Sequence, residues 1–311
     1  MPSPSPAATP SPTPPPQRSK VTCIGVGPVT GNQARCVIAY SLFVPHSRAL
    51  PKMDRYLTGL QARRFEAGYH FPGWETRLYL DGRFTKGMAD VIRKLGYNVV
   101  HLGPSDTSLP EWHHMASRML VIDDPEVDVF MMRDLDSALS PRDAISTWAW
   151  MTSGASFLSM HDHFAHVDII LGGMWGGRTE AARRLIAPNG IAAFLDSAAK
   201  MDEKFGNDQI LIAKLVYPKI HPEVLHFDLT QAACKHDGKM CVPFPMVPHT
   251  GHKIEGHVGE IVGSRALMPR HVDVACKELV GGLENTPVFE EADLQAQWLG
   301  GAWPRMRGFC K

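Results

Sequence analysis

The chain has 311 residues, of which 44% are hydrophobic and 21% are charged, and this composition supplies ample apolar surface for a buried core. Its 32 basic and 32 acidic side chains cancel, so no net positive field favours binding to nucleic acid or to an anionic membrane. No stretch approaches the roughly 18 apolar residues of a membrane span, and the N-terminus lacks the apolar core of a secretory signal.

The six cysteines are sparse for this length and form no CxxC pairs. This spacing predicts neither a disulfide framework nor a zinc ribbon, and it is typical of proteins in a reducing compartment. We therefore expect a cytoplasmic protein.

Residues 1–20 contain eight of the 25 prolines, mixed with Ser, Thr and Ala. Such a segment cannot bury enough apolar surface to offset the entropy lost on ordering, so we expect a disordered tail. The tail serves either as a docking segment or as a solvated extension. We expect the catalytic domain to span residues 21–262, with residues 263–311 as an extension packed on it.

From residue 34 onward, strand and helix patterns alternate, which indicates an α/β layer structure with a largely parallel sheet. Strands are expected at 35–43, 75–80, 97–102, 127–132 and 157–160. Helices are expected at 52–68, 85–95, 112–119, 141–150, 179–186, 191–204 and 208–217.

The strand expected at 127–132 is apolar apart from Asp128, as a central parallel strand is when both its faces are covered. The charged residues Arg133, Asp134 and Asp136 follow it at once. In open α/β sheets ligands bind beyond the carboxyl ends of the strands, so these residues stand where a ligand is expected.

On an extended segment, side chains two positions apart point the same way, so Asp134 and Asp136 can converge on one hard cation. Mg²⁺ or Mn²⁺ suits such oxygen ligands and would bridge the phosphates of a nucleotide diphosphate, neutralising the charge of the leaving group. A structural interpretation is also open, in which both carboxylates cap the following helix or pair with Arg133 and Arg142.

Two segments resemble a group of glycosyltransferase-like proteins of the GT-A fold: DVFMMRDLDS at Asp128–Ser137 and SMHDHFAHVDIILGGMWGG at Ser159–Gly177. In that group a strand ends in RDxDS and a later loop contains GGMWG. Softer matches follow in the same order: IAYSLF at 38–43, YHFPGWETRLYLDG at 69–82, FGNDQ at 205–209 and KHD at 235–237. The resemblance covers roughly residues 35–260 and implies a mixed, mainly parallel sheet flanked by helices.

The resemblance also implies site residues. It suggests that Asp134 and Asp136 bind metal and sugar nucleotide, with His236 as a later metal ligand. The residues that it places near the donor, counting the arginine of RDxDS, are Ser41, Leu42, Phe43, Asp81 and Arg133.

The glycine cluster around Trp175 offers a second set of donor contacts. Gly172 and Gly173 let backbone amides approach a sugar or phosphate closely, and the Trp175 ring either floors the donor site or belongs to the core. Arg178 begins a helix, where a basic residue opposes the helix dipole and needs an anionic partner. That partner is either a donor phosphate or a surface carboxylate.

Two acidic residues are candidates for catalysis. Asp208 opens the helix expected at 208–217 and either caps it or acts as the general base that removes a proton from the acceptor hydroxyl. Asp162, beside His163 and His166, either holds a donor hydroxyl or has a structural role.

We therefore predict a metal-dependent, hexosyltransferase-like enzyme that moves a sugar from a nucleotide-diphosphate sugar to a glycan or other hydroxyl acceptor. One alternative is a metallohydrolase that uses His161, Asp162, His163 and His166, although their spacing matches neither HxHxDH nor HExxH. The other is a non-catalytic nucleotide-sugar-binding protein of the same fold.

Overall fold

The computed structural model describes residues 34–43, 53–103, 110–163, 166–201, 207–229, 241–245 and 258. The tail of residues 1–20 and the extension 263–311 lie outside these ranges. The expected domain boundaries therefore stay predictions.

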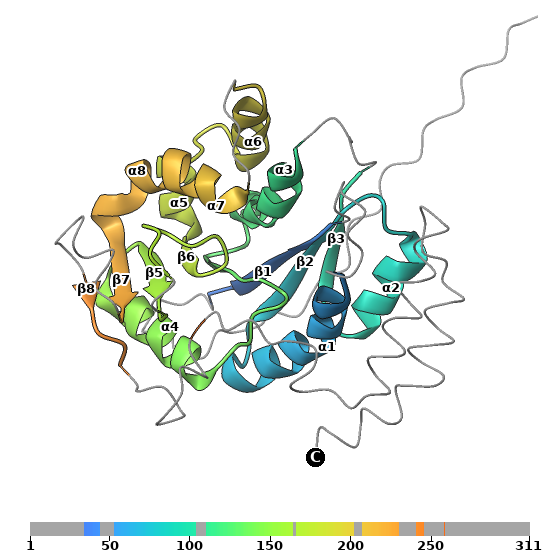
Figure 1. The fold of residues 1–311 in the computed structure, drawn as a ribbon, viewed down its shortest axis with the longest axis horizontal. Helices are drawn as coiled ribbons and strands as arrows, with labels where there is room; N and C mark the ends of the chain where they lie inside the picture. The colour runs from blue at the N-terminus through green and yellow to red at the C-terminus, as the bar shows by residue number, and fades with distance from the viewer. Residues whose placement is uncertain are drawn as a thin grey trace, which may run out of the picture.

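Within the described residues, eight strands form one sheet in the order β3-β2-β1-β4-β6-β5-β7-β8 (Figure 1). The strands are β1 (Cys36–Leu42), β2 (Glu75–Leu80), β3 (Asn98–His101), β4 (Val129–Met132), β5 (Phe157–His161), β6 (Trp175–Arg178), β7 (Val224–Asp228) and β8 (Cys241–Val242). All neighbours are parallel except that β6 runs antiparallel to both β4 and β5. The expected mixed, mainly parallel sheet is confirmed.

Helices cover both faces of the sheet (Figure 1). One layer contains α1 (Met53–His70), α2 (Lys86–Lys94) and α4 (Pro141–Ser153). The other contains α3 (Glu111–Ala116), the 3₁₀ helix η2 (Ser117–Asp123), α5 (Thr179–Leu185), α6 (Ile191–Ala199), and the continuous run α7 (Asp208–Leu211), π-helical η3 (Ile212–Val216) and α8 (Tyr217–Ile220). The short 3₁₀ helix η4 (His221–Glu223) leads into β7.

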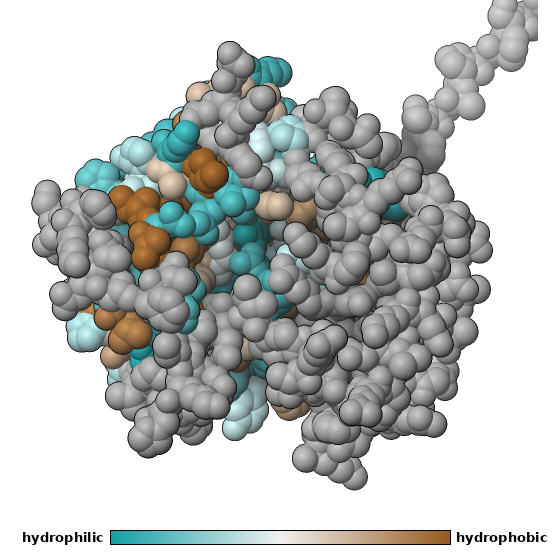
Figure 2. Space-filling model, in the orientation of Figure 1, coloured by the Kyte–Doolittle hydropathy of each residue, from teal (hydrophilic) through white to brown (hydrophobic). Residues whose placement is uncertain are grey.

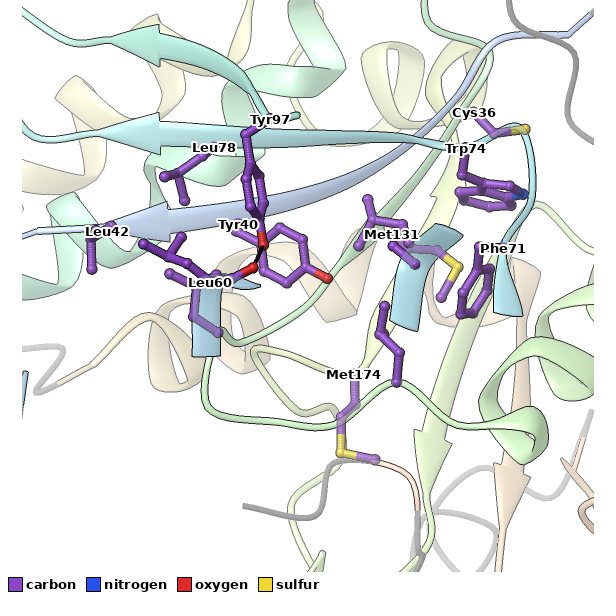
Figure 3. Packing of buried hydrophobic residues seen from close by; sticks show 14 of the residues in the cluster. Cys36, Tyr40, Leu42, Leu60, Phe71, Trp74, Leu78, Tyr97, Met131 and Met174 are labelled. Atoms are coloured by element: carbon purple, nitrogen blue, oxygen red, sulfur yellow. Dashed lines mark hydrogen bonds between the residues drawn. The ribbon is translucent and has the colours of Figure 1, made fainter. Parts of the chain in front are cut away.

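The core has two halves because successive side chains of a strand point to opposite faces of the sheet. From β1, Ile38 and Tyr40 face the layer of α1, α2 and α4, whereas Val37 and Ala39 face the other layer. Figure 3 shows the first half, where the hydroxyl of Tyr97 donates to the carbonyl of Leu60 at 2.6 Å. Complete burial of a large apolar side chain contributes about 1.5–3 kcal/mol, so both halves stabilise the sheet that positions the site.

Two helices differ from expectation at their ends. The helix expected at 191–204 ends at Ala199, because the amides of Lys200 and Met201 bond to carbonyls three residues back and tighten the last turn. The helix expected at 208–217 continues to Ile220 through the π-helical segment η3. A π-helical turn inside a helix is frequent at functional sites.

The cysteines depart from the sequence-based expectation. Cys36 and Cys241 are each disulfide-bonded. They are not bonded to each other: four strands separate β1 from β8, a distance of about 24 Å at ~4.8 Å per strand, whereas bonded cysteines have Cα atoms about 4.4–6.8 Å apart. Disulfides persist mainly in oxidising compartments, so the cysteines do not support a reducing one.

No helix in the described ranges is both long enough and apolar enough to span a membrane. The cytoplasmic location stays a prediction.

Candidate active site

The candidate site lies at the carboxyl edge of the sheet, just beyond β4. Asp134 stands there with a side chain that is 44% exposed. Its Oδ1 accepts a hydrogen bond from Nη1 of Arg118 at 2.5 Å. Its Oδ2 lies 2.1 Å from where a β-carbon on Gly173 would stand, so any side chain at position 173 would have to displace this carboxylate. The approach of these glycines to a sugar or phosphate stays a prediction, because the close contact that the structure shows is with this carboxylate.

Arg118, on η2, is a buried cation at this edge and belongs to none of the sequence motifs. Its side chain is buried, with Nη1 also donating to the carbonyl of Arg133 at 2.8 Å and Nη2 donating to Oδ2 of Asp208 at 2.7 Å. Burial lowers the pKa of Arg118, but the charges and hydrogen bonds of Asp134 and Asp208 outweigh burial and raise that pKa above its ordinary value. Arg118 is therefore charged and shared by two carboxylates.

Asp208 is the first residue of α7, but it does not cap the helix. The cap is Asn207, whose Oδ1 accepts a hydrogen bond from the amide of Ile210 at 3.0 Å. The capping interpretation of Asp208 is therefore wrong. Its carboxylate points instead at Arg118, and its Oδ1 lies 3.0 Å from where a β-carbon on Gly172 would stand.

The electrostatic surroundings of Asp208 suit proton transfer. Its side chain is only 9% exposed. Burial raises the pKa of its carboxyl, against the opposing charge of Arg118. A buried carboxylate with a raised pKa, joined through Arg118 to a partly exposed carboxylate, is a candidate general base.

The geometry of the aspartate pair differs from the sequence-based expectation. The amide of Ser137 donates to the carbonyl of Asp134 at 3.1 Å, so the chain turns after β4 instead of staying extended. As a result Asp136 is buried while Asp134 is partly exposed. The argument that the two side chains point the same way therefore fails.

A metal at this edge fits the described residues only in part. They contain no group of three or more His, Cys, Asp and Glu side chains that could hold an ion, and His236 lies outside them. However, Mg²⁺ usually keeps several waters and is bound by one or two carboxylates plus substrate phosphates. The partly exposed Asp134 fits a cation that is held jointly with a diphosphate.

The helix cap and the Arg133 pairing that the structural alternative assigns to the aspartate pair are made by other residues. Ser140 caps α4 by accepting a hydrogen bond from the amide of Asp143 at 3.2 Å. Arg133 is buried and binds both carboxylate oxygens of Asp143, at 2.7 and 3.1 Å. Arg133 is thus tied into the core, and the structure does not support it as a donor-binding residue.

Asp162 has a structural role in this fold. It is fully buried and binds Arg142 through both carboxylate oxygens at 2.5 Å. One of these oxygens also accepts the amide of Val258 at 2.9 Å. Both carboxylate oxygens are already hydrogen-bonded inside the protein. This favours the structural interpretation over a contact with a donor hydroxyl.

The histidines expected for a metallohydrolase are held in other contacts. His161 is fully buried, its Nε2 lies 2.9 Å from the hydroxyl of Ser159, and burial lowers its pKa. The ring nitrogen Nδ1 of His166 accepts a hydrogen bond from the amide of Asp162 at 3.2 Å. In the part of the chain that the structure describes, these residues do not converge on an ion.

Trp175 and Arg178 lie at opposite ends of β6, and Trp175 pairs with Met132 at the carboxyl end of β4 but packs its side chain into the core. Trp175 is fully buried and packs edge-on against Phe130, with ring centroids 5.3 Å apart, so it is a core residue and not the floor of a donor site. Arg178 pairs in register with Val129, at the amino end of β4. Its guanidinium donates to the carbonyl of Met151 at 3.0 Å, so the structure does not support the expected phosphate contact.

The residues expected near the nucleoside do lie at the carboxyl edge, since they end β1 and follow β2. Leu42 is buried in the core, whereas the Phe43 ring stacks on His114 with centroids 6.3 Å apart. The hydroxyl of Ser41 donates to the carbonyl of Met115 at 2.8 Å.

Asp81 is also buried at this edge, and it holds the side chain of Arg83 through hydrogen bonds of 2.6 and 3.0 Å. A contact between Asp81 and a ligand would have to replace or share this pairing. Figure 2 shows hydrophilic residues gathered in a recess in the middle of the face, near the positions of α3 and α7 in Figure 1.

No protein-family model and no curated protein sequence match the chain. Solved structures do. A glycosyltransferase involved in the glycosylation of the major capsid of PBCV-1 is 14% identical and has a TM-score of 0.40, over 67% of this chain and 91% of that one.

Two further structures are each 10% identical to the chain. The 4-diphosphocytidyl-2C-methyl-D-erythritol synthase of Anaerococcus prevotii has a TM-score of 0.35, over 62% of this chain and 87% of that one. The glucosyl-3-phosphoglycerate synthase of Mycobacterium tuberculosis, in complex with phosphoglyceric acid, has a TM-score of 0.34, over 85% of this chain and 80% of that one. At these identities the likeness does not extend to individual residues or to activity.

Proposed function

We propose that the chain is a glycosyltransferase that binds a nucleotide-diphosphate sugar beside Asp134 and uses Asp208 as the general base toward an acceptor hydroxyl. One observation carries the proposal: Arg118 joins a partly exposed carboxylate to a buried one whose pKa is raised. The resemblance of the RDxDS and GGMWG segments to GT-A glycosyltransferases supports it.

The acceptor half of the reaction rests on Asp208. Asp208 takes the proton of the acceptor hydroxyl while the hydroxyl oxygen attacks the anomeric carbon of the donor. The bond between that carbon and the diphosphate oxygen breaks, and its electron pair leaves with the diphosphate. The configuration of the anomeric carbon inverts, because in a single displacement the acceptor oxygen attacks from the face opposite to the leaving diphosphate.

The donor half rests on the surroundings of Asp134. Because Gly172 and Gly173 lack side chains, the carboxylates of Asp208 and Asp134 lie close against the backbone at these two positions. A divalent cation, Mn²⁺ or Mg²⁺, bound by Asp134 together with the donor phosphates would neutralise the charge of the leaving diphosphate. Asp136 and His236 stay predicted additional ligands.

The test is a screen of nucleotide sugars with the full chain and Mn²⁺, in which the release of nucleoside diphosphate is measured with and without glycan acceptors. We expect one donor to be hydrolysed slowly and to be consumed faster when the matching acceptor is added. Asp134→Asn should reduce the rate by about 10²–10³-fold, the usual cost of losing one electrostatic contact to the transition state.

Asp90 provides the matched control. It forms an exposed pair with Arg93 on α2, so Asp90→Asn should keep full activity. Wild-type activity in Asp134→Asn, or no donor consumed by the wild type, would refute transfer at this site. In the second case, stabilisation of the fold by a nucleoside diphosphate would favour the non-catalytic binding protein.

A further inference from the structure

We propose that Arg118 is a positioning residue that fixes the distance between the donor side and the acceptor side of the site, by holding Asp134 with one amino group and Asp208 with the other. This inference rests on the proposed function. It adds to that function a residue that touches neither substrate and acts through the two carboxylates.

The geometry of the guanidinium supports this role. Nη1 and Nη2 are rigidly joined, and each bonds a different carboxylate, at 2.5 Å to Asp134 and 2.7 Å to Asp208. Nη1 also donates to the main-chain carbonyl of Arg133, which anchors the fork to the end of β4. The planar fork of arginine therefore sets the separation of two groups that are 74 residues apart in the chain, from Asp134 to Asp208.

The backbone of η2 holds Arg118 itself in place. The hydroxyl of Ser117 donates to the carbonyl of His114 at 2.7 Å, at the junction of α3 and η2. Farther along η2, Val121 and Ile122 are fully buried in the core half beneath this layer. Arg118 is thus a buried side chain on a helix that is packed into the core.

The buried carboxylate of Asp208 needs the positive charge of Arg118 beside it. Asp208 is almost fully buried, and an ionised carboxylate in that position without a nearby cation is strongly disfavoured. Lysine would keep the positive charge but has a single ammonium nitrogen in place of the fork. Arg118→Lys therefore separates the charge of Arg118 from its ability to position both carboxylates.

The test combines Arg118→Lys, Asp208→Asn and the double variant. We expect Arg118→Lys to lower kcat by up to about 100-fold, the cost of a displacement of about 1 Å, with the KM for donor changed by less than about threefold. In the Asp208→Asn background the same substitution should lower kcat by a smaller factor than in the wild type, because only the positioning of Asp134 is then left to lose and groups that act together are not additive. Arg184→Lys, in an exposed pair with Glu223, is the matched control.

Two kinetic results would overturn the proposal. A raised donor KM with an unchanged kcat in Arg118→Lys would make Arg118 a direct contact of the donor. Equal losses of kcat in the presence and absence of Asp208 would show that Arg118 does not act through that carboxylate.

A measurement of Tm separates this inference from the proposed function, because it needs no substrate. Arg118→Met should lower Tm by roughly 5 °C or more, since it leaves buried charge unpaired, and Asp208→Asn should lessen that loss. If Arg118→Met does not fold, the same comparison is made with Arg118→Lys. Additive Tm shifts would refute the bridge even if transfer is found, and coupled shifts would support it even if no donor is consumed.

Discussion

Two buried arginines of this fold hold carboxylates in different ways. Arg142 gives its whole guanidinium to one carboxylate, that of Asp162, and both partners are inaccessible to solvent. Arg118 divides its guanidinium between Asp134 and Asp208, and one of these carboxylates is 44% exposed. The closed pair satisfies its charges completely and holds the fold together. The shared guanidinium of Arg118 leaves the carboxylate of Asp134 partly exposed to solvent, where a ligand can reach it.

The largest effect that we expect from this difference concerns Asp208. Asp208→Asn should lower the rate of sugar transfer by about 10²–10⁴-fold, because the amide cannot take the proton of the acceptor hydroxyl. In the wild type, activity should fall on acidification at a pH above the ordinary carboxyl value of about 3.9, since burial raises the pKa of Asp208 and the base must be ionised. Rate profiles against pH for both proteins check this, and an unchanged acid limb in the variant would contradict it.

The closed pair should respond in stability and not in activity. Asp162→Asn leaves the buried Arg142 without its counter-charge, so we expect a loss of about 3–5 kcal/mol in the free energy of unfolding. The kcat of the molecules that remain folded should be nearly unchanged. Denaturant unfolding measures the loss, with the exposed Asp90→Asn as the control, for which less than about 1 kcal/mol is expected. A variant of normal stability that has lost catalysis would restore Asp162 as a catalytic candidate.

The glycine beside Asp134 gives a smaller and more local effect. In Gly173→Ala the new methyl group would stand 2.1 Å from Oδ2 of Asp134 and must displace that side chain. We expect kcat/KM for the donor to fall by about 10- to 100-fold, as for other small displacements of site groups. Gly103→Ala, where a β-carbon meets no atom within 4 Å, should leave kcat/KM unchanged. Equal activity of both variants would remove Asp134 from the donor site.

Local patterns were sufficient to predict much of the fold and less of the site. The strands β1 to β5 each carry a compact apolar run, and all five form where the sequence places them. β6 does not, because WGGR has little strand propensity and becomes a strand only by pairing with β4 and β5. Because that strand is antiparallel to β4, Arg178 lies at the amino end of β4, at the edge opposite to the site.

The composition of the site depends on contacts between distant segments. Asp134 was predicted because its position at a strand end is a local property. Arg118 was not, because only the tertiary fold brings its side chain to Asp208, which is 90 residues farther along the chain. The helix cap could have been predicted from the sequence, because Asn207, one residue before Asp208, is an equally good capping residue.

The central claim is that the donor diphosphate binds beside Asp134 and that its sugar faces Asp208. A crystal structure of the full chain with a nucleotide sugar and Mn²⁺ tests it most directly. We predict that the diphosphate contacts the open side of Asp134 next to Gly172 and Gly173. A donor bound elsewhere, with no ligand atom near either carboxylate, would contradict the account.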